Sequence, residues 1–190
     1  MIPTPEWWLL HKAKSGDRDA FGTLYDRHAP RVFQLLYRLT GSSTAAEDLT
    51  QETFLTAWQS LSTWQGRGVF GTWLCGIAVN HSRTLSRSQR ESDLLDESNE
   101  PAAPEGDPLQ HLTRSEAEQA LEHAIMQLPP ACREAFLLVR IEGMRYQEAA
   151  QLLNIPLGTV QSRIHRATSL LKISLTAEAE LSQKETYNVV

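Results

Sequence analysis

The chain has 190 residues, of which 41% are hydrophobic and 22% are charged, and its formal net charge is −5. These values are ordinary for a globular protein, and no apolar run approaches the roughly 20 residues that a membrane helix needs. The N-terminus also lacks the layout of a signal peptide, so we expect a cytoplasmic protein without direct membrane insertion.

The motifs indicate neither a metal site nor an active site. Cys75 and Cys132 are far apart, and the six histidines are scattered without a metal-binding pair. The sequence contains no glycine-rich phosphate loop and no nucleophile elbow. We therefore expect no catalytic residues, no metal, no cofactor and no small-molecule substrate. Helical patterns dominate, so the predicted fold class is all-α.

The first block begins with two predicted helices, over 7–14 and 19–39. Pro30 lies inside the second, which predicts a kink near Ala29 because proline removes a backbone donor. A turn at 41–43 follows. Thr44 and Glu47 then have the spacing of a capping box that would open a third helix.

The third predicted helix has one hydrophobic face and one polar face. Its inward face is expected to carry Ala46, Leu49, Thr53, Ala57 and Leu61. Its outward face carries Asp48, Gln51, Glu52 and Gln59, and Leu55 lies among them. A leucine surrounded by acids and amides is either a tolerated surface residue or the centre of a protein contact.

A fourth helix is predicted from Phe70 to about Arg90, after a loop over 64–69. Its core face is Phe70, Trp73, Leu74, Ile77 and Leu85. A second face is polar and basic, and it consists of Gly76, Asn80, Arg83, Arg87 and Arg90. Basic tracks beside aromatic side chains such as Trp64 suit single-stranded nucleic acid. The alternative is an ordinary exposed basic face with tryptophans in the core.

Residues 91–110 separate the two blocks. This stretch holds seven acidic residues and three prolines but no lysine or arginine, so it predicts an extended, flexible linker, which we place at 91–114. Without 91–110, 16 acidic and 18 basic residues remain. The folded parts are therefore expected to be slightly basic.

The second block is predicted to contain a helix-turn-helix. A helix over 121–127 and a second one that ends at Glu142, before Gly143, precede it. The motif itself consists of helices over 146–153 and 157–172, separated by Asn154, which tolerates the left-handed conformation, and by Pro156.

The last predicted helix has a buried face and a polar face. The buried face is Val160, Ile164, Ala167 and Leu171, and the polar face is Gln161, Ser162, His165 and Arg166, with Arg163 on the flank. Residues 145–172 carry a local charge of +3. Such a face suits base edges and phosphates in a major groove, although it is also compatible with an ordinary solvated helical hairpin.

Taken together, these motifs resemble the extracytoplasmic-function (ECF) group of the bacterial sigma-70 family of transcription initiation factors. In the first block the resemblance rests on AFGTLYDRHAPRVF, AEDLTQETFLTAW and FGTWLCGIAVN. In the second it rests on LPPACREAFLL, EGMRYQEAAQLL and IPLGTVQSRIHRA. It implies sigma region 2 at 1–90, the acidic linker at 91–114, sigma region 4 at 115–175 and a short tail at 176–190 without an assigned role.

The resemblance also implies partners and sites. Core RNA polymerase, through the clamp of its largest subunit, would bind Asp48, Gln51, Glu52 and Leu55. The promoter −35 element would be read by Thr159, Gln161, Ser162, Arg163, His165 and Arg166. The −10 element would be opened by Trp64, Arg67, Phe70, Trp73, Asn80, Arg83 and Arg87. An anti-sigma factor is implied as a further partner, and the linker would thread toward the polymerase active centre.

Three residues depart from the family pattern. Gly76 and Thr84 stand where a basic residue and an aspartate are common, and Gln161 replaces a frequent basic residue. Rival functions are a stand-alone helix-turn-helix regulator of duplex DNA, an adaptor that does not touch DNA and, least favoured, an enzyme. A simple regulator needs no acidic surface centred on Leu55 and no aromatic loop beside a basic stripe.

Overall fold

A computed structural model describes residues 5–66, 68–93 and 116–187, with side chains placed for 5–66, 68–89 and 117–176. The chain divides into two compact units, Met1–Glu105 and Gly106–Val190. All regular elements in the described residues are helices, which confirms the all-α prediction. Most of the predicted linker, 94–114, lies outside the described residues.

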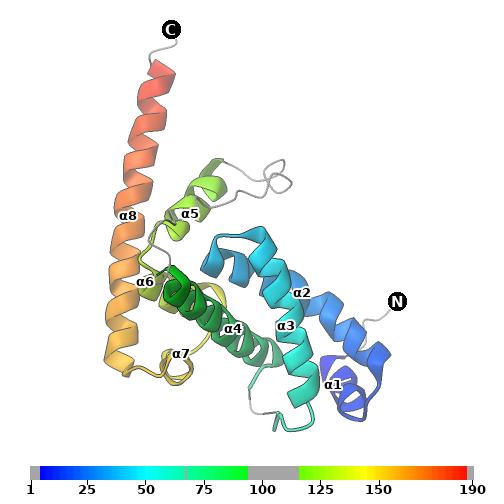
Figure 1. Ribbon diagram of the computed structural model, residues 1–190. Coiled ribbons are helices and arrows are strands. Elements are labelled where there is room, and N and C mark those ends of the chain that lie inside the picture. The colour runs from blue at the N-terminus through cyan, green and yellow to red at the C-terminus, as the bar shows by residue number, and fades with distance from the viewer. Residues whose placement is uncertain (1–4, 67, 94–115, 188–190) are drawn as a thin grey trace. The chain divides into compact units, whose positions relative to one another are not determined.

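The first unit contains α1 (Glu6–Lys14), α2 (Arg18–Thr40), α3 (Ser43–Ser60) and α4 (Phe70–Asp93) (Figure 1). α2 packs against the other three helices, and α3 also packs against α4. The core between them is built from aliphatic side chains that are completely or almost completely buried, among them Leu24, Leu35, Leu36, Leu61, Leu74 and Val79. α2 is one continuous helix with Pro30 inside it.

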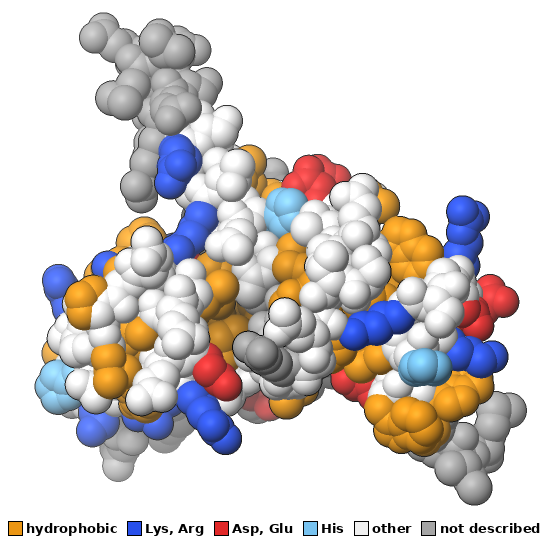
Figure 2. All heavy atoms as spheres, turned by 90° about the horizontal axis from the view of Figure 1, so that it is seen from below, with side chains coloured by type: hydrophobic (Ala, Val, Ile, Leu, Met, Phe, Trp, Pro, Cys, Tyr) orange, Lys and Arg blue, Asp and Glu red, His pale blue; other side chains and the backbone are white. Residues whose placement is uncertain are grey.

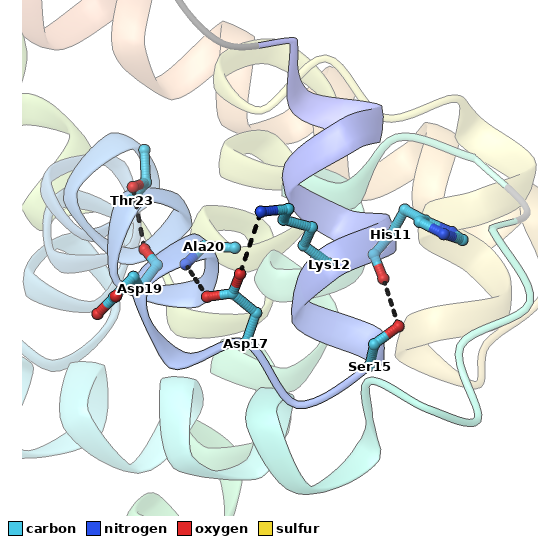
Figure 3. Close-up of polar contacts among 7 residues, drawn as sticks. All are labelled: His11, Lys12, Ser15, Asp17, Asp19, Ala20 and Thr23. Atoms are coloured by element: carbon cyan, nitrogen blue, oxygen red, sulfur yellow. Dashed lines mark hydrogen bonds and ion pairs between the residues drawn. The ribbon is translucent and has the colours of Figure 1, made fainter.

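The junction of α1 and α2 is held by Asp17. Its carboxylate accepts a hydrogen bond from the Ala20 N–H at 3.0 Å and lies 3.6 Å from Lys12 Nζ (Figure 3). The hydrogen bond from Ala20 lowers the pKa of Asp17. Desolvation opposes this effect, and the positive charge of Lys12 adds a smaller lowering. An ionised Asp17 is thus the N-cap of α2.

The predicted capping box at Thr44 and Glu47 is wrong. α3 begins at Ser43, and the Oγ of Ser42 accepts the cap hydrogen bond from the Ala45 N–H at 3.3 Å. A capping residue needs a non-helical backbone, which Ser42 has, whereas Thr44 is already inside the helix. Gly41, with a φ of 76°, ends α2 just before this cap.

The second unit contains α5 (Glu116–Met126), α6 (Pro130–Phe136), the π-helix η1 (Leu137–Ile141), α7 (Tyr146–Leu153) and α8 (Leu157–Tyr187) (Figure 1). α5, α6 and α7 all pack against α8. Leu137 and Leu138 of η1 and Val160 of α8 are completely buried. This core orients the opposite, polar face of α8 toward solvent.

The structure differs from three predicted helix boundaries in this unit. α5 begins at Glu116, five residues before the predicted start at Leu121. The predicted helix up to Glu142 changes to π geometry at Leu137, where the Glu142 N–H donates to the Leu137 carbonyl at 2.9 Å. α8 continues past the predicted end at Lys172, because no glycine or proline follows before Tyr187. Gly143, with a φ of 72°, and Asn154, with a φ of 52°, adopt the left-handed conformation as predicted.

Candidate nucleic-acid and protein interfaces

The polar face of α3 lies at the surface. Asp48, Gln51 and Glu52 are exposed, and Leu55 keeps 61% of its surface accessible. The predicted inward face is confirmed, because its members are at most 5% exposed: Ala46, Leu49, Thr53, Ala57 and Leu61. Glu52 Oε2 lies 3.4 Å from His81 Nδ1 of α4, so α4 supports this surface from the side.

A groove of about 440 Å³ adjoins Leu55. Aromatic rings of α2 and α3 form most of its wall: Tyr25 contacts Phe54 at 4.6 Å and Phe21 contacts Trp58 at 4.8 Å between ring centroids. Hydrophobic side chains reach the surface next to lysine and arginine side chains in several places (Figure 2). Sequence reasoning missed the α2 wall, because helical periodicity within α3 carries no information about a neighbouring helix.

Three aromatic side chains meet where the loop after α3 enters α4. Trp64 stacks on Trp73 at 5.6 Å and contacts the edge of Phe70 at 5.5 Å. Phe70 is only 2% exposed, so its ring supports the cluster and cannot stack on a base in this conformation. Trp64 and Trp73 are partly exposed, and Val69 is 65% exposed. Arg67 lies outside the described residues.

The polar stripe of α4 starts near this cluster. Asn80 and Arg87 are exposed, and Arg83 is partly buried. Thr84, at the position that departs from the family pattern, is exposed and donates its hydroxyl to the Asn80 carbonyl at 3.0 Å. The hydroxyl of Thr84 is thereby engaged with the helix backbone.

The predicted faces of α8 are confirmed. Val160, Ile164, Ala167 and Leu171 are buried, whereas Gln161, Ser162, His165 and Arg166 are exposed, and Thr159 and Arg163 are partly exposed. The Ser162 hydroxyl donates to the Thr159 carbonyl at 3.0 Å, which leaves the amide, imidazole and guanidinium groups as the longer polar side chains of this face.

A shallow cleft of about 270 Å³ lies beside this face. Arg140 of η1 and Tyr146 of α7 line it together with Gln161 and His165 of α8. Sequence reasoning did not include Arg140 and Tyr146 among the site residues, because only the packing of η1 and α7 on α8 brings them there. Across the described ranges, no group of three or more potential ligands could hold a metal ion, and no helix is long and apolar enough to cross a membrane.

Comparisons with known proteins match both units. A family model described as sigma-70 region 2 matches residues 24–92, and one described as sigma-70, region 4 matches residues 118–171. The ECF RNA polymerase sigma factor SigW of Bacillus subtilis is 31% identical over 178 residues, which cover 87% of this chain and 94% of SigW.

Two solved structures are also similar. The sigma factor RpoE, in complex with the anti-sigma factor NepR from Bartonella quintana, has a TM-score of 0.71 at 24% identity and covers 82% of this chain and 96% of its own. CnrH, in complex with the cytosolic domain of CnrY, has a TM-score of 0.62 at 29% identity and covers 89% of this chain and 96% of its own. At 24% identity, the similarity to RpoE concerns the fold alone.

Proposed function

The chain belongs to the ECF group of the bacterial sigma-70 family, and we propose that its two units divide promoter recognition between them. It is a transcription initiation factor. The main support for this division of promoter recognition is that the region 2 model matches the first unit and the region 4 model matches the second. Each unit also has an exposed polar helix face. A stand-alone helix-turn-helix regulator is not favoured, because it would not need a region 2.

In the second unit, α8 enters the major groove of the −35 element. Its exposed Gln161, His165 and Arg166 are amide, imidazole and guanidinium groups, which can contact base edges. Thr159, Ser162 and Arg163 lie on the same face or its flank and contribute phosphate contacts. Arg166 is exposed, and a guanidinium can make a bidentate contact with guanine, so Arg166 is the main determinant of sequence preference in this proposal.

In the first unit, the loop after α3 and the stripe of α4 open the −10 element. The partly exposed rings of Trp64 and Trp73 offer surfaces on which unstacked bases can stack, and Asn80 can hydrogen bond to a base edge. Arg83 and Arg87 follow Asn80 along α4 and pair with phosphates, as we also propose for Arg67. Phe70 supports Trp64 and Trp73 from within the core.

The surface centred on Leu55 binds the clamp of core RNA polymerase. An exposed leucine beside an aromatic groove, with Asp48, Gln51 and Glu52 around it, has the apolar centre and polar rim of a protein interface. The chain itself carries no catalytic residues in this proposal, since the polymerase performs the chemistry. Its place of action is the cytoplasm, where promoter DNA and polymerase meet.

An anti-sigma factor restrains this chain. Support comes from the similarity to CnrH, whose structure was solved with the cytosolic domain of CnrY. We expect a stable complex between this chain and the product of a neighbouring gene in cells under non-inducing conditions. Affinity purification of the tagged chain from such cells is the measurement, and the absence of any such partner would contradict this proposal.

Run-off transcription tests the central function. The purified chain, added to core RNA polymerase, is expected to produce transcripts from promoters upstream of its own operon, whereas core polymerase alone should produce none. Duplex binding by the chain alone, without any transcript in the presence of core enzyme, would instead favour a stand-alone regulator.

A further inference from the structure

Helix α1 lies before residue 24, where the match to sigma-70 region 2 begins. It is nevertheless fixed to the first unit. Leu9 and Ala13 are each 3% exposed, and Glu6 Oε2 lies 3.3 Å from His28 Nε2 of α2. At its end, Lys12 lies 3.6 Å from the capping Asp17. The burial of Leu9 and Ala13 and the pair of Glu6 with His28 set where the last residue of α1, Lys14, can reach.

Lys14 contacts Trp64, which is 50 residues away in the sequence, in two ways. Its Nζ donates a hydrogen bond to the Trp64 carbonyl oxygen. The same Nζ lies 5.1 Å from the centroid of the Trp64 ring, within the range of a cation–π contact. One ammonium group therefore restrains both the backbone and the ring of this tryptophan.

The Trp64 ring also contacts aromatic side chains of α4. Trp73 stacks on it at 5.6 Å with an angle of 29° between the rings, and Trp73 and Phe70 belong to α4. Between α1 and the loop lies a groove of about 430 Å³, lined among others by Trp7, His11, Lys14, Trp64 and Phe70. Trp64 thus contacts both a cation of α1 and aromatic rings of α4, and it lines an open groove.

We propose that Lys14 is a positioning residue for promoter opening, which holds Trp64 in the orientation that receives an unstacked −10 base. This inference rests on the proposed role of Trp64. Trp73 and Phe70 contact the Trp64 ring from α4, and Lys14 adds a second restraint from α1 that acts on both the ring and the backbone before DNA arrives. Preorganisation of this kind favours the opened state without adding a contact to duplex DNA.

The test replaces Lys14 by methionine, which keeps the length of the side chain but removes the charge and the donor. Lys12→Met is the matched control, because Lys12 is on the same helix and lies 4.4 Å from the ring of a different tryptophan, Trp8. Its ion pair with Asp17 is at the surface and contributes little, and the cap hydrogen bond from Ala20 to Asp17 does not need it. We expect Lys14→Met to lower permanganate reactivity of −10 thymines on duplex promoters by about five- to seventyfold, the range expected for losing two such contacts. The −35 footprint and transcription from a pre-opened template should be unchanged, and Lys12→Met should behave as wild type.

Two further variants separate positioning from a direct phosphate contact. Lys14→Arg should retain most of the opening activity, since guanidinium can make both contacts. In a Trp64→Ala background, Lys14→Met should cause no additional loss. An equal effect of Lys14→Met and Lys12→Met, or an additive loss in the Trp64→Ala background, would overturn the positioning role. Normal opening by Trp64→Ala alone would overturn the assignment of Trp64 itself, and the role of Lys14 with it.

Discussion

Leu55→Arg is expected to lower the affinity of this chain for core RNA polymerase by more than about tenfold, which corresponds to a loss of over about 1.4 kcal/mol. Leu55 is 61% exposed, so an arginine there does not disturb the core behind α3. It does place a charge, which must be desolvated, at the centre of the apolar surface beside the Phe54 and Tyr25 rings. Co-purification with core enzyme and a binding titration measure the effect.

Ile173→Arg is the matched control for this variant. It makes the same kind of substitution at a side chain that is 67% exposed, on α8 in the other unit and outside the range matched by region 4. Both variants should keep the thermal unfolding midpoint of wild type. If Leu55→Arg binds core polymerase as well as Ile173→Arg does, the surface centred on Leu55 is not the polymerase contact.

Arg166→Ala and Asn80→Ala are expected to fail at different steps. Loss of a bidentate contact between Arg166 and guanine costs about 1–3 kcal/mol, so closed complexes on duplex promoters should weaken and discrimination at one base pair should relax. Initiation from a template with a pre-opened −10 bubble should be spared. Asn80→Ala should keep a near-normal −35 footprint but show reduced permanganate reactivity of unpaired thymines.

Lys172→Ala provides the electrostatic control for Arg166→Ala. It removes one positive charge from the same helix, six residues after Arg166, where the rise of about 1.5 Å per residue places it about 9 Å farther along the axis. If only the lost positive charge mattered, both variants would form closed complexes on duplex promoters equally poorly. If Arg166 contacts a base, only Arg166→Ala should show this loss. Equal losses of footprint and of thymine reactivity in Arg166→Ala and Asn80→Ala would contradict the division of labour between the units, but not membership of the family.

Features that depend on neighbours in the sequence were predicted from the sequence by itself. The 3.6-residue period of α8 separates Val160 and Ile164 from Gln161 and Arg166, and the structure confirms that separation. Asn154 and Gly143 adopt the left-handed conformation that their residue types favour. The exposed position of Leu55 on α3 follows from the same periodicity, because the heptad-like spacing of Ala46, Leu49, Thr53 and Ala57 specifies the buried side.

Features that join distant segments were decided by the tertiary structure. The groove beside Leu55 needs Phe21 and Tyr25 of α2, and the restraint on Trp64 needs Lys14 of α1. Residue type alone also did not predict which residue caps α3, because Ser42 and Thr44 can both act as N-caps. The packing of α2 against α3 sets the point at which the backbone becomes helical. The physical reason is common to these cases. The periodicity of hydrophobic residues predicts which face of each helix is buried. Which other helix covers that face depends on how the helices pack together.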